Sequence, residues 1–251
     1  MEIKAPAKIN LYFQIKGKRD DGYHEIYSMV QTIDIYDHLV VVKADDYQLT
    51  GAMVCDPRES LITKAVRVLE LFTQSKLPVH VHLDKVIPLG AGMGGGSSDA
   101  AATLVALNEI YDLRLSLIQL MQQAELIGSD VPLFLVGGLC TIQGRGEQVN
   151  QLLGLNVGPM LIFRPHMRLN TTPAYEEYDK TGKSFSEMAI NKCKPLHDLI
   201  KLVRDFTISG KGPTAFIRTS WISWREWMNS WDGDVFLARP VHRPGPLEPY
   251  L

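Results

Sequence analysis

The chain lacks several features that would place it in other classes of protein. Its 251 residues include three cysteines, Cys55, Cys140 and Cys193, an odd and widely scattered set that excludes a disulfide framework and indicates a reducing compartment. No apolar run reaches the roughly 18 residues of a membrane span, and no charged leader precedes an apolar stretch at the start. We therefore expect a cytoplasmic protein that does not enter membranes.

Positive charge is also scarce. Lysine and arginine number 26 against 28 aspartates and glutamates, which gives a formal net charge of −2. Binding to nucleic acid or anionic membranes needs a concentrated basic surface, so any attraction for an anion must be local. His80 and His82 would share one face of a strand, but no third ligand stands near them. We expect no metal site, no nucleic-acid partner and no membrane partner.

The pattern of apolar residues predicts a mixed fold. Alternating and β-branched residues predict strands over 9–17, 22–44 and 78–88. Helical periodicity predicts helices over 59–74, 97–111 and 116–127. Two apolar runs around Gly137 and Gly138, followed by a glycine-rich turn, predict a hairpin over 132–149. Strands ahead of helices favour an α+β sandwich of two lobes, residues 1–150 and residues 151–251.

Residues 88–104, "PLGAGMGGGSSDAAATL", stand out as a glycine loop between a strand and a helix. Gly90, Gly92 and Gly95 satisfy G-x-G-x-x-G, but no acidic residue follows a second strand about 20 residues on, so a dinucleotide fold is disfavoured. A Walker A loop needs Gly-Lys-Ser/Thr where this chain has Gly96, Ser97 and Ser98, and that interpretation is excluded.

The loop still has the physical chemistry of a phosphate site. Glycines let backbone N–H groups converge on an anion, and the helix that follows directs the positive end of its dipole there. Ser97 or Ser98 is expected to cap that helix. A flexible linker is disfavoured, because it has no reason to lie between a strand and a capped helix. The predicted phosphate-binding residues are Pro88, Leu89, Gly90, Ala91, Gly92, Met93, Gly94, Gly95, Gly96, Ser97 and Ser98.

Three segments resemble one known family. The loop is similar to the phosphate loop of the GHMP kinases, and its triple glycine resembles that of the 4-diphosphocytidyl-2-C-methylerythritol kinases among them. Residues 5–37 carry the A-K-I-N-L and D-G-Y-H signatures of that family, and residues 126–138, "LIGSDVPLFLVGG", resemble its G-[SA]-D-V-P-F-F segment. The motifs follow in the expected order over residues 5–147.

The resemblance implies a fold and an activity. The fold would be the two-lobed α+β GHMP kinase fold, with an N-terminal ribosomal-protein-S5-like lobe and a shortened, ferredoxin-like C-terminal lobe. The activity would be ATP-dependent phosphorylation of the 2-hydroxyl of 4-diphosphocytidyl-2-C-methyl-D-erythritol, in the non-mevalonate (MEP) pathway to isoprenoid precursors. ATP and Mg²⁺ would be the cofactors, and the small cytidyl diphosphate would be the partner; neither Mg²⁺ ligands nor an oligomeric state follow from it.

The resemblance also assigns site residues. Lys8 and Asp130 match the catalytic pair, with Asp130 as general base and Lys8 stabilising developing negative charge. Without the motifs, Lys8 would be a solvated edge-strand lysine and Asp130 a helix N-cap before proline. Asn10, Tyr23 and His24 match positions that bind the cytidyl group, although Tyr23 alone would suit ordinary packing. Thr172 and Tyr175 are expected to close the other side of the cytosine.

Some segments depart from the family pattern. The third motif, "SGKGPT", has Lys211 where the family has a small residue, and the segment around residues 188–200 is shorter than the family pattern. Tryptophans recur every three or four residues at Trp221, Trp224, Trp227 and Trp231 and are expected to pack on the protein's own core. Two alternatives therefore stay open. Another GHMP small-molecule kinase is disfavoured by D-G-Y-H and the triple glycine, and a nucleotide-binding homologue with reduced catalysis is opposed by Lys8 and Asp130.

Overall fold

The fold is built around one long strand. The computed structural model describes residues 1–51, 56–154, 157–165, 178–180 and 233–241. Strand β2 (His24–Lys43) pairs along its length with the antiparallel strand β1 (Glu2–Lys18). On its other side, β2 pairs first with β5 (Leu139–Gly144) and then with β4 (Val79–Asp84). The β2 strand therefore brings together segments that are far apart in the sequence.

Two short strands complete the six-stranded sheet. Its order is β3-β4-β2-β5-β6, with β1 beside β2; β3 is Gln48–Gly51 and β6 is Gln148–Gln151. A separate two-stranded sheet joins β7 (Met160–Pro165) to β8 (Gly233–Ala238). Every strand predicted from alternation is present, and β1 begins earlier than predicted because Ile3, Ala5 and Ala7 are also buried.

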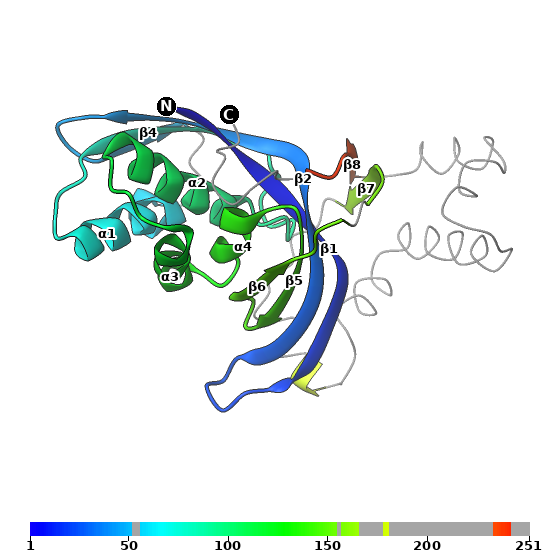
Figure 1. Ribbon diagram of the computed structural model, residues 1–251. Helices are drawn as coiled ribbons and strands as arrows, with labels where there is room; N and C mark the ends of the chain where they lie inside the picture. Colours follow the sequence, from blue (N-terminus) through cyan, green and yellow to red (C-terminus); the bar gives the residue numbers. More distant parts are fainter. Residues whose placement is uncertain (52–55, 155–156, 166–177, 181–232, 242–251) are drawn as a thin grey trace, which may run out of the picture. The chain divides into compact units, whose positions relative to one another are not determined.

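Helices pack together on one face of the large sheet (Figure 1). They are α1 (Leu61–Thr73), α2 (Gly95–Ile110), α3 (Leu117–Ile127) and α4 (Val131–Val136), preceded by the 3₁₀ turn η1 (Pro57–Glu59). Buried side chains of all four helices and of β1, β2 and β4 form one apolar core. Burial of this apolar surface holds the helices against the sheet. In the described part of the chain, no helix is long and apolar enough to cross a membrane.

Two predictions about elements were wrong. The first apolar run of 132–149 forms helix α4 instead of the first strand of a hairpin, and the hairpin lies one step later, between β5 and β6. Pro132 in the first turn and a buried run that packs against α2 and α3 favour the helix. The other error concerns α2, which begins at Gly95 and has Gly94 at its N-cap, whereas Ser97 or Ser98 was expected there.

The chain divides into two compact units. One consists of Met1–Leu161 with Leu237–Leu251, and the other of Ile162–Phe236. The first unit contains the large sheet, the four helices and the glycine loop. The predicted lobes, 1–150 and 151–251, stay predictions. Thr172, Tyr175, Lys211 and the four tryptophans lie outside the described residues.

Candidate active site

The glycine loop forms a hollow at the start of α2. Gly90, Gly92 and Gly94 have φ angles of 64°, 70° and 71°, the left-handed region that glycine adopts without strain. The hollow has a volume of about 80 Å³ and is lined by Lys85 and by residues 88–96. Because Ser98 N–H makes the first bond of the helix, to the Gly94 carbonyl, the three N–H groups before it have no acceptor inside their own helix. The loop therefore offers backbone donors to an anion.

The two serines lie differently from what was expected. Both belong to the first turn of α2, and neither is its N-cap. Ser97 is half-buried, whereas Ser98 is 1% exposed and its Oγ has no hydrogen-bond partner in the described part of the chain. The glycines therefore set the shape of the loop, and the two serines lie after the loop, in the helix.

Lys8 and Asp130 come together beside this loop. Lys8 Nζ lies 3.6 Å from Asp130 Oδ2, and the Lys8 side chain is 10% exposed. The Lys8 backbone N–H donates to the Met93 carbonyl at 3.0 Å, which joins β1 to the loop. A Cβ on Gly94 would lie 3.1 Å from Lys8 Cγ and 2.7 Å from the Phe134 ring of α4. The loop, the lysine and the helix behind Asp130 are thus in direct contact.

Asp130 stands at the N-cap position of α4, but its side chain makes no capping hydrogen bond. Its carboxylate is 39% exposed and faces Lys8. Asp130 is therefore at the N-cap position, as the alternative interpretation had it, but its side chain contacts Lys8 and does not cap the helix.

Asn10 holds Lys8 in place. Its Oδ1 accepts from Lys8 Nζ at 2.8 Å, and its Nδ2 donates to Ser28 Oγ at 2.7 Å. The pairing of β1 with β2 shifts register between Asn10 and Tyr12, and bulges of this kind re-aim side chains near functional sites. Asn10 therefore contacts the lysine of the pair directly, a contact that the sequence did not indicate.

Tyr23 and His24 stand at the turn that joins β1 to β2. The Tyr23 side chain is 53% exposed, and its backbone N–H donates to Asp21 Oδ1 at 3.1 Å. Burial acts to raise the pKa of Asp21, but the hydrogen bonds that its carboxylate accepts from Tyr23 N–H and from Arg19 hold this pKa below its usual value. His24 is half-buried and begins β2. The exposed ring of Tyr23 could receive another flat group.

Several known proteins are similar to this chain. Residues 60–138 match the model of the GHMP kinases N terminal domain. A 4-diphosphocytidyl-2-C-methyl-D-erythritol kinase of Thermodesulfovibrio yellowstonii is 40% identical over 179 residues, 71% of this chain and 63% of the relative. A kinase of the same name from Acinetobacter baylyi is 35% identical over 188 residues, 73% of this chain and 67% of the relative. The chain belongs to the 4-diphosphocytidyl-2-C-methyl-D-erythritol kinase family.

Solved structures agree with this family. The crystal structure of a 4-(cytidine 5'-diphospho)-2C-methyl-D-erythritol kinase is similar with a TM-score of 0.69 and 26% identity, over 97% of this chain and 100% of the other. The Methanococcus jannaschii mevalonate kinase shares the fold with a TM-score of 0.64 at 14% identity, over 96% of this chain and 98% of the other. The matched segments span only about two thirds of the two curated kinases. The resemblance found in the sequence, and the GHMP kinase fold, are confirmed.

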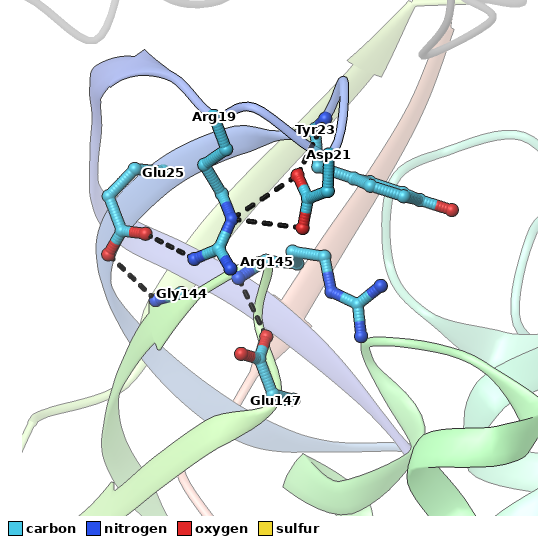
Figure 2. Close-up of polar contacts among 7 residues, drawn as sticks. All are labelled: Arg19, Asp21, Tyr23, Glu25, Gly144, Arg145 and Glu147. Atoms are coloured by element: carbon cyan, nitrogen blue, oxygen red, sulfur yellow. Dashed lines mark hydrogen bonds and ion pairs between the residues drawn. The ribbon is translucent and has the colours of Figure 1, made fainter.

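One residue of this family member was missed in the sequence. Arg145 lies in the turn between β5 and β6, and its guanidinium lies over the Tyr23 ring, 4.9 Å from the centroid (Figure 2). In the described part of the chain, this guanidinium makes no ion pair within 4.0 Å. The only available signal was the glycine-rich turn "GRGE", which indicates a bend without indicating what faces it.

The turn that carries Arg145 is held from both sides. Glu25 accepts from Gly144 N–H at 3.2 Å and from Arg19 Nη1 at 2.7 Å, and Glu147 accepts from Arg145 N–H at 2.6 Å (Figure 2).

Gly146, in the same turn, has a φ of 120°, and a Cβ there would lie 3.6 Å from Asp130 Oδ1. The turn therefore adjoins both Tyr23 and Asp130.

Proposed function

We propose that this chain transfers the terminal phosphoryl group of ATP to the 2-hydroxyl of 4-diphosphocytidyl-2-C-methyl-D-erythritol, in the non-mevalonate (MEP) pathway to isoprenoid precursors. The observation that carries the proposal is the meeting of Lys8 and Asp130 beside Gly94, at the end of the phosphate loop. Phosphoryl transfer to an alcohol needs positioning, charge stabilisation and a group to take the proton. The names of the relatives supply the acceptor.

Asp130 would accept the proton of the substrate hydroxyl. Its carboxylate is partly exposed and is not used for helix capping, so an oxygen is available to a hydroxyl. Lys8 would orient that hydroxyl and stabilise the negative charge that develops on it. Asn10 would keep the ammonium in place through the 2.8 Å bond that it accepts.

The phosphate loop fits the nucleotide. The left-handed glycines shape the loop, and the first N–H groups of α2, which have no acceptor inside their own helix, are donors of the kind that nucleotide phosphates require. ATP supplies the phosphoryl group, and residues 88–98 would hold its phosphates in line with the acceptor. Mg²⁺ is commonly bound through one or two carboxylates together with substrate phosphates. Among the described residues no group of three or more His, Cys, Asp or Glu could hold a metal ion, so we propose that Mg²⁺ enters with the nucleotide.

The turn of Tyr23 and Arg145 would bind the other end of the substrate. The Tyr23 ring offers a face for cytosine, and His24 a hydrogen-bonding edge. Arg145 lies over this aromatic face and the next residue, Gly146, adjoins Asp130, so a diphosphate that links the pyrimidine to the reacting alcohol would pass along this turn. Among the described residues Arg145 has no carboxylate within 4.0 Å, so its guanidinium can pair with that charge. Thr172 and Tyr175 keep their predicted part in closing the cytosine site.

The finer architecture belongs to the same proposal. We propose an N-terminal ribosomal-protein-S5-like lobe and a shortened, ferredoxin-like C-terminal lobe. The solved kinase that is similar over 97% of the chain supports it. We further propose that the protein acts in the cytoplasm on a small molecule, without nucleic acid or membrane.

The test is release of ADP by the purified protein with ATP and Mg²⁺. We expect turnover with 4-diphosphocytidyl-2-C-methyl-D-erythritol and none with mevalonate or homoserine. Turnover with either of those two alcohols instead would assign the chain to another GHMP small-molecule activity. Nucleotide binding without turnover on any alcohol would support the homologue with reduced catalysis, which Lys211 and the shortened segment 188–200 motivated.

A further inference from the structure

A buried ion cluster lies directly beneath the phosphate loop. Lys85 follows β4, and its Nζ donates to Asp37 Oδ2 of β2 at 2.5 Å and to Asp99 Oδ2 of α2 at 2.7 Å. The side chains of the lysine and of the two aspartates are 9%, 0% and 3% exposed. One ammonium therefore faces two carboxylates with little water around them.

The cluster contacts both ends of the loop. Asp37 Oδ1 accepts from the backbone N–H groups of Val86 and Ile87 at 2.6 and 2.7 Å, which fixes the exit from β4. Asp99 belongs to the first turns of α2, at the other end of the loop. Lys85 also lines the hollow, and a Cβ on Gly95 would lie 2.7 Å from its Nζ. We propose that Lys85, Asp37 and Asp99 are positioning residues of the phosphate loop, and that a phosphate enters the loop together with a proton on Asp99.

The proton belongs to Asp99 because its carboxylate is the less well satisfied of the two. Asp37 receives three donors, whereas Asp99 receives only Lys85, and Asp99 Oδ1 is buried without a hydrogen-bond partner in the described part of the chain. Burial, with the nearby Asp37 charge, raises the pKa of Asp99 to about 7 against the opposing effect of Lys85. A buried carboxylate with a second negative charge close by keeps its proton to higher pH.

In the part of the chain that the structure describes, the other charged groups of the elements packed against the cluster face solvent or other partners. Lys8 of β1 reaches Gly94, at the start of the helix, but is bound to Asn10 and faces Asp130. Helix α4 carries no charged residue. The charged residues of α1 and α3 are exposed or bound to other groups, and they are Lys64, Arg67, Glu70 and Glu125.

The direction of the pH effect follows from these charges. With Asp99 ionised, the cluster carries a net negative charge beside the phosphate; with Asp99 protonated, it is neutral. A bound phosphate therefore raises the pKa of Asp99 further, and binding takes up a proton. The affinity for phosphate is greatest below the pKa of Asp99 in the free protein, about 7. It falls by up to about tenfold per pH unit above that pKa.

The test is calorimetric titration with the Mg²⁺ complex of the β,γ-imido analogue of ATP, in buffers of different ionisation enthalpy. Asp99→Asn keeps the shape of the side chain but cannot take the proton, and Glu109→Gln, exposed on the same helix, is the matched control. At pH 7 we expect the wild type and Glu109→Gln to take up about half a proton more than Asp99→Asn. This difference should approach one at pH 8 and vanish at pH 5.5, and subtraction removes the proton uptake of the nucleotide itself.

The outcomes are distinct. Equal proton uptake by the wild type and Asp99→Asn would overturn the inference while leaving the proposed kinase intact, because the nucleotide would still bind. No binding of the nucleotide by the wild type would overturn both, since the inference rests on the proposed function. If Asp99→Asn does not fold, the infrared carbonyl band of a protonated carboxylic acid in the wild type decides: it should grow when nucleotide is added at pH 8, and no growth would contradict the proposal.

The positioning role of Lys85 has its own readout. Lys85→Met should raise the KM for ATP more than tenfold and leave kcat at saturating ATP within a few-fold, because the residue shapes the loop without touching the acceptor. Lys76→Met, at an 89% exposed side chain, is the matched control and should change neither constant. Equal losses in kcat for Lys85→Met and for a variant of the catalytic pair would contradict the role.

Discussion

Lys8 and Asp130 depend on a third side chain for their geometry. Asn10 accepts from the ammonium and donates to Ser28, so its amide holds the ammonium of Lys8 in place. Asp130 is held by its place at the first turn of α4. Single side chains at this site therefore carry separable tasks, and single substitutions can test them.

The first residue-scale prediction concerns Asp130. We expect Asp130→Asn to lower the turnover of ATP and the cytidyl alcohol by about 10²- to 10⁴-fold, because an amide cannot accept the hydroxyl proton. The affinity for nucleotide should stay within a few-fold. Steady-state rates and equilibrium binding measure the two effects. Asp84→Asn, at an exposed carboxylate of β4, is the control. An unchanged rate for Asp130→Asn would rule out Asp130 as the base.

The second residue-scale prediction concerns Arg145. We expect Arg145→Gln to raise the KM for the cytidyl substrate about 10- to 100-fold, the loss of one hydrogen bond to a charged group. The KM for ATP should not change, since Arg145 faces Tyr23 rather than the glycine loop. Arg114→Gln, with a 79% exposed side chain in a surface pair, is the matched control. A rise in the KM for ATP alone would place Arg145 on the nucleotide side.

At the scale of elements, the loop and α2 act as one piece. Three left-handed glycines alternate with Ala91 and Met93, and the last of them, Gly94, is the N-cap of α2. Gly94 also packs against Phe134 of α4 and Lys8 of β1. The loop shape therefore depends on the absence of a side chain at one position where three elements meet.

Gly94→Ala should consequently destabilise the protein. A left-handed φ of 71° strains alanine, and its Cβ would overlap the Phe134 ring at 2.7 Å. We expect a loss of ~1–3 kcal/mol in the free energy of unfolding. Gly96→Ala, two residues on, meets nothing nearer than 3.8 Å and should instead stabilise the helix by about 0.5–1 kcal/mol. Chemical denaturation measures both, and equal stabilities would contradict the argument.

Elements with a clear period were predictable, and their ends were not. The strands β1, β2 and β4 and the helices α1, α2 and α3 follow from alternation or helical spacing, whereas the short strand β3 and the strands β7 and β8 were not predicted. Helix α4 was not predicted either, because a six-residue apolar run suits a buried strand as well as a helix. The start of α2 was misplaced because serine is a common N-cap, whereas here three glycines select the turn and Gly94 ends it.

The site was predictable only as far as motifs reach. The glycine loop was found from its composition and its place before a helix, and Lys8 and Asp130 were found through resemblance, although nothing in the sequence says that positions 8 and 130 meet. The contacts of Asn10 with Lys8, of Arg145 with Tyr23 and of Lys85 with two aspartates depend on strand register, which a single sequence does not give.

At the scale of the whole molecule, β2 contacts segments that are far apart in the sequence. Residues 239–241 return to it: Asp34 N–H donates to the Arg239 carbonyl at 3.0 Å, and Val241 N–H donates to the Thr32 carbonyl at 2.9 Å. The first compact unit accordingly contains Leu237–Leu251 as well as Met1–Leu161. The site is thus built on a strand that contacts both the beginning of β5 and residues more than 200 positions away.

A substitution at Thr32 tests whether the contacts of β2 with Gly138 and with residues 239–241 stabilise the fold. The buried Oγ1 of Thr32 accepts from Gly138 N–H at 2.8 Å and lies 3.4 Å from the carbonyls of Gly138 and Val241. Valine keeps the shape but leaves the Gly138 N–H without its hydroxyl acceptor, so Thr32→Val should cost ~1–3 kcal/mol. For a chain of this size each kcal/mol lowers Tm by about 2–4 °C.

Thr50→Val, at an exposed hydroxyl where water can replace the lost bonds, should change Tm by less than about 1 °C. Calorimetry that follows the whole unfolding curve is required, because two compact units need not unfold together. An equal shift for the two variants would mean that the hydroxyl of Thr32 does not hold these three segments together.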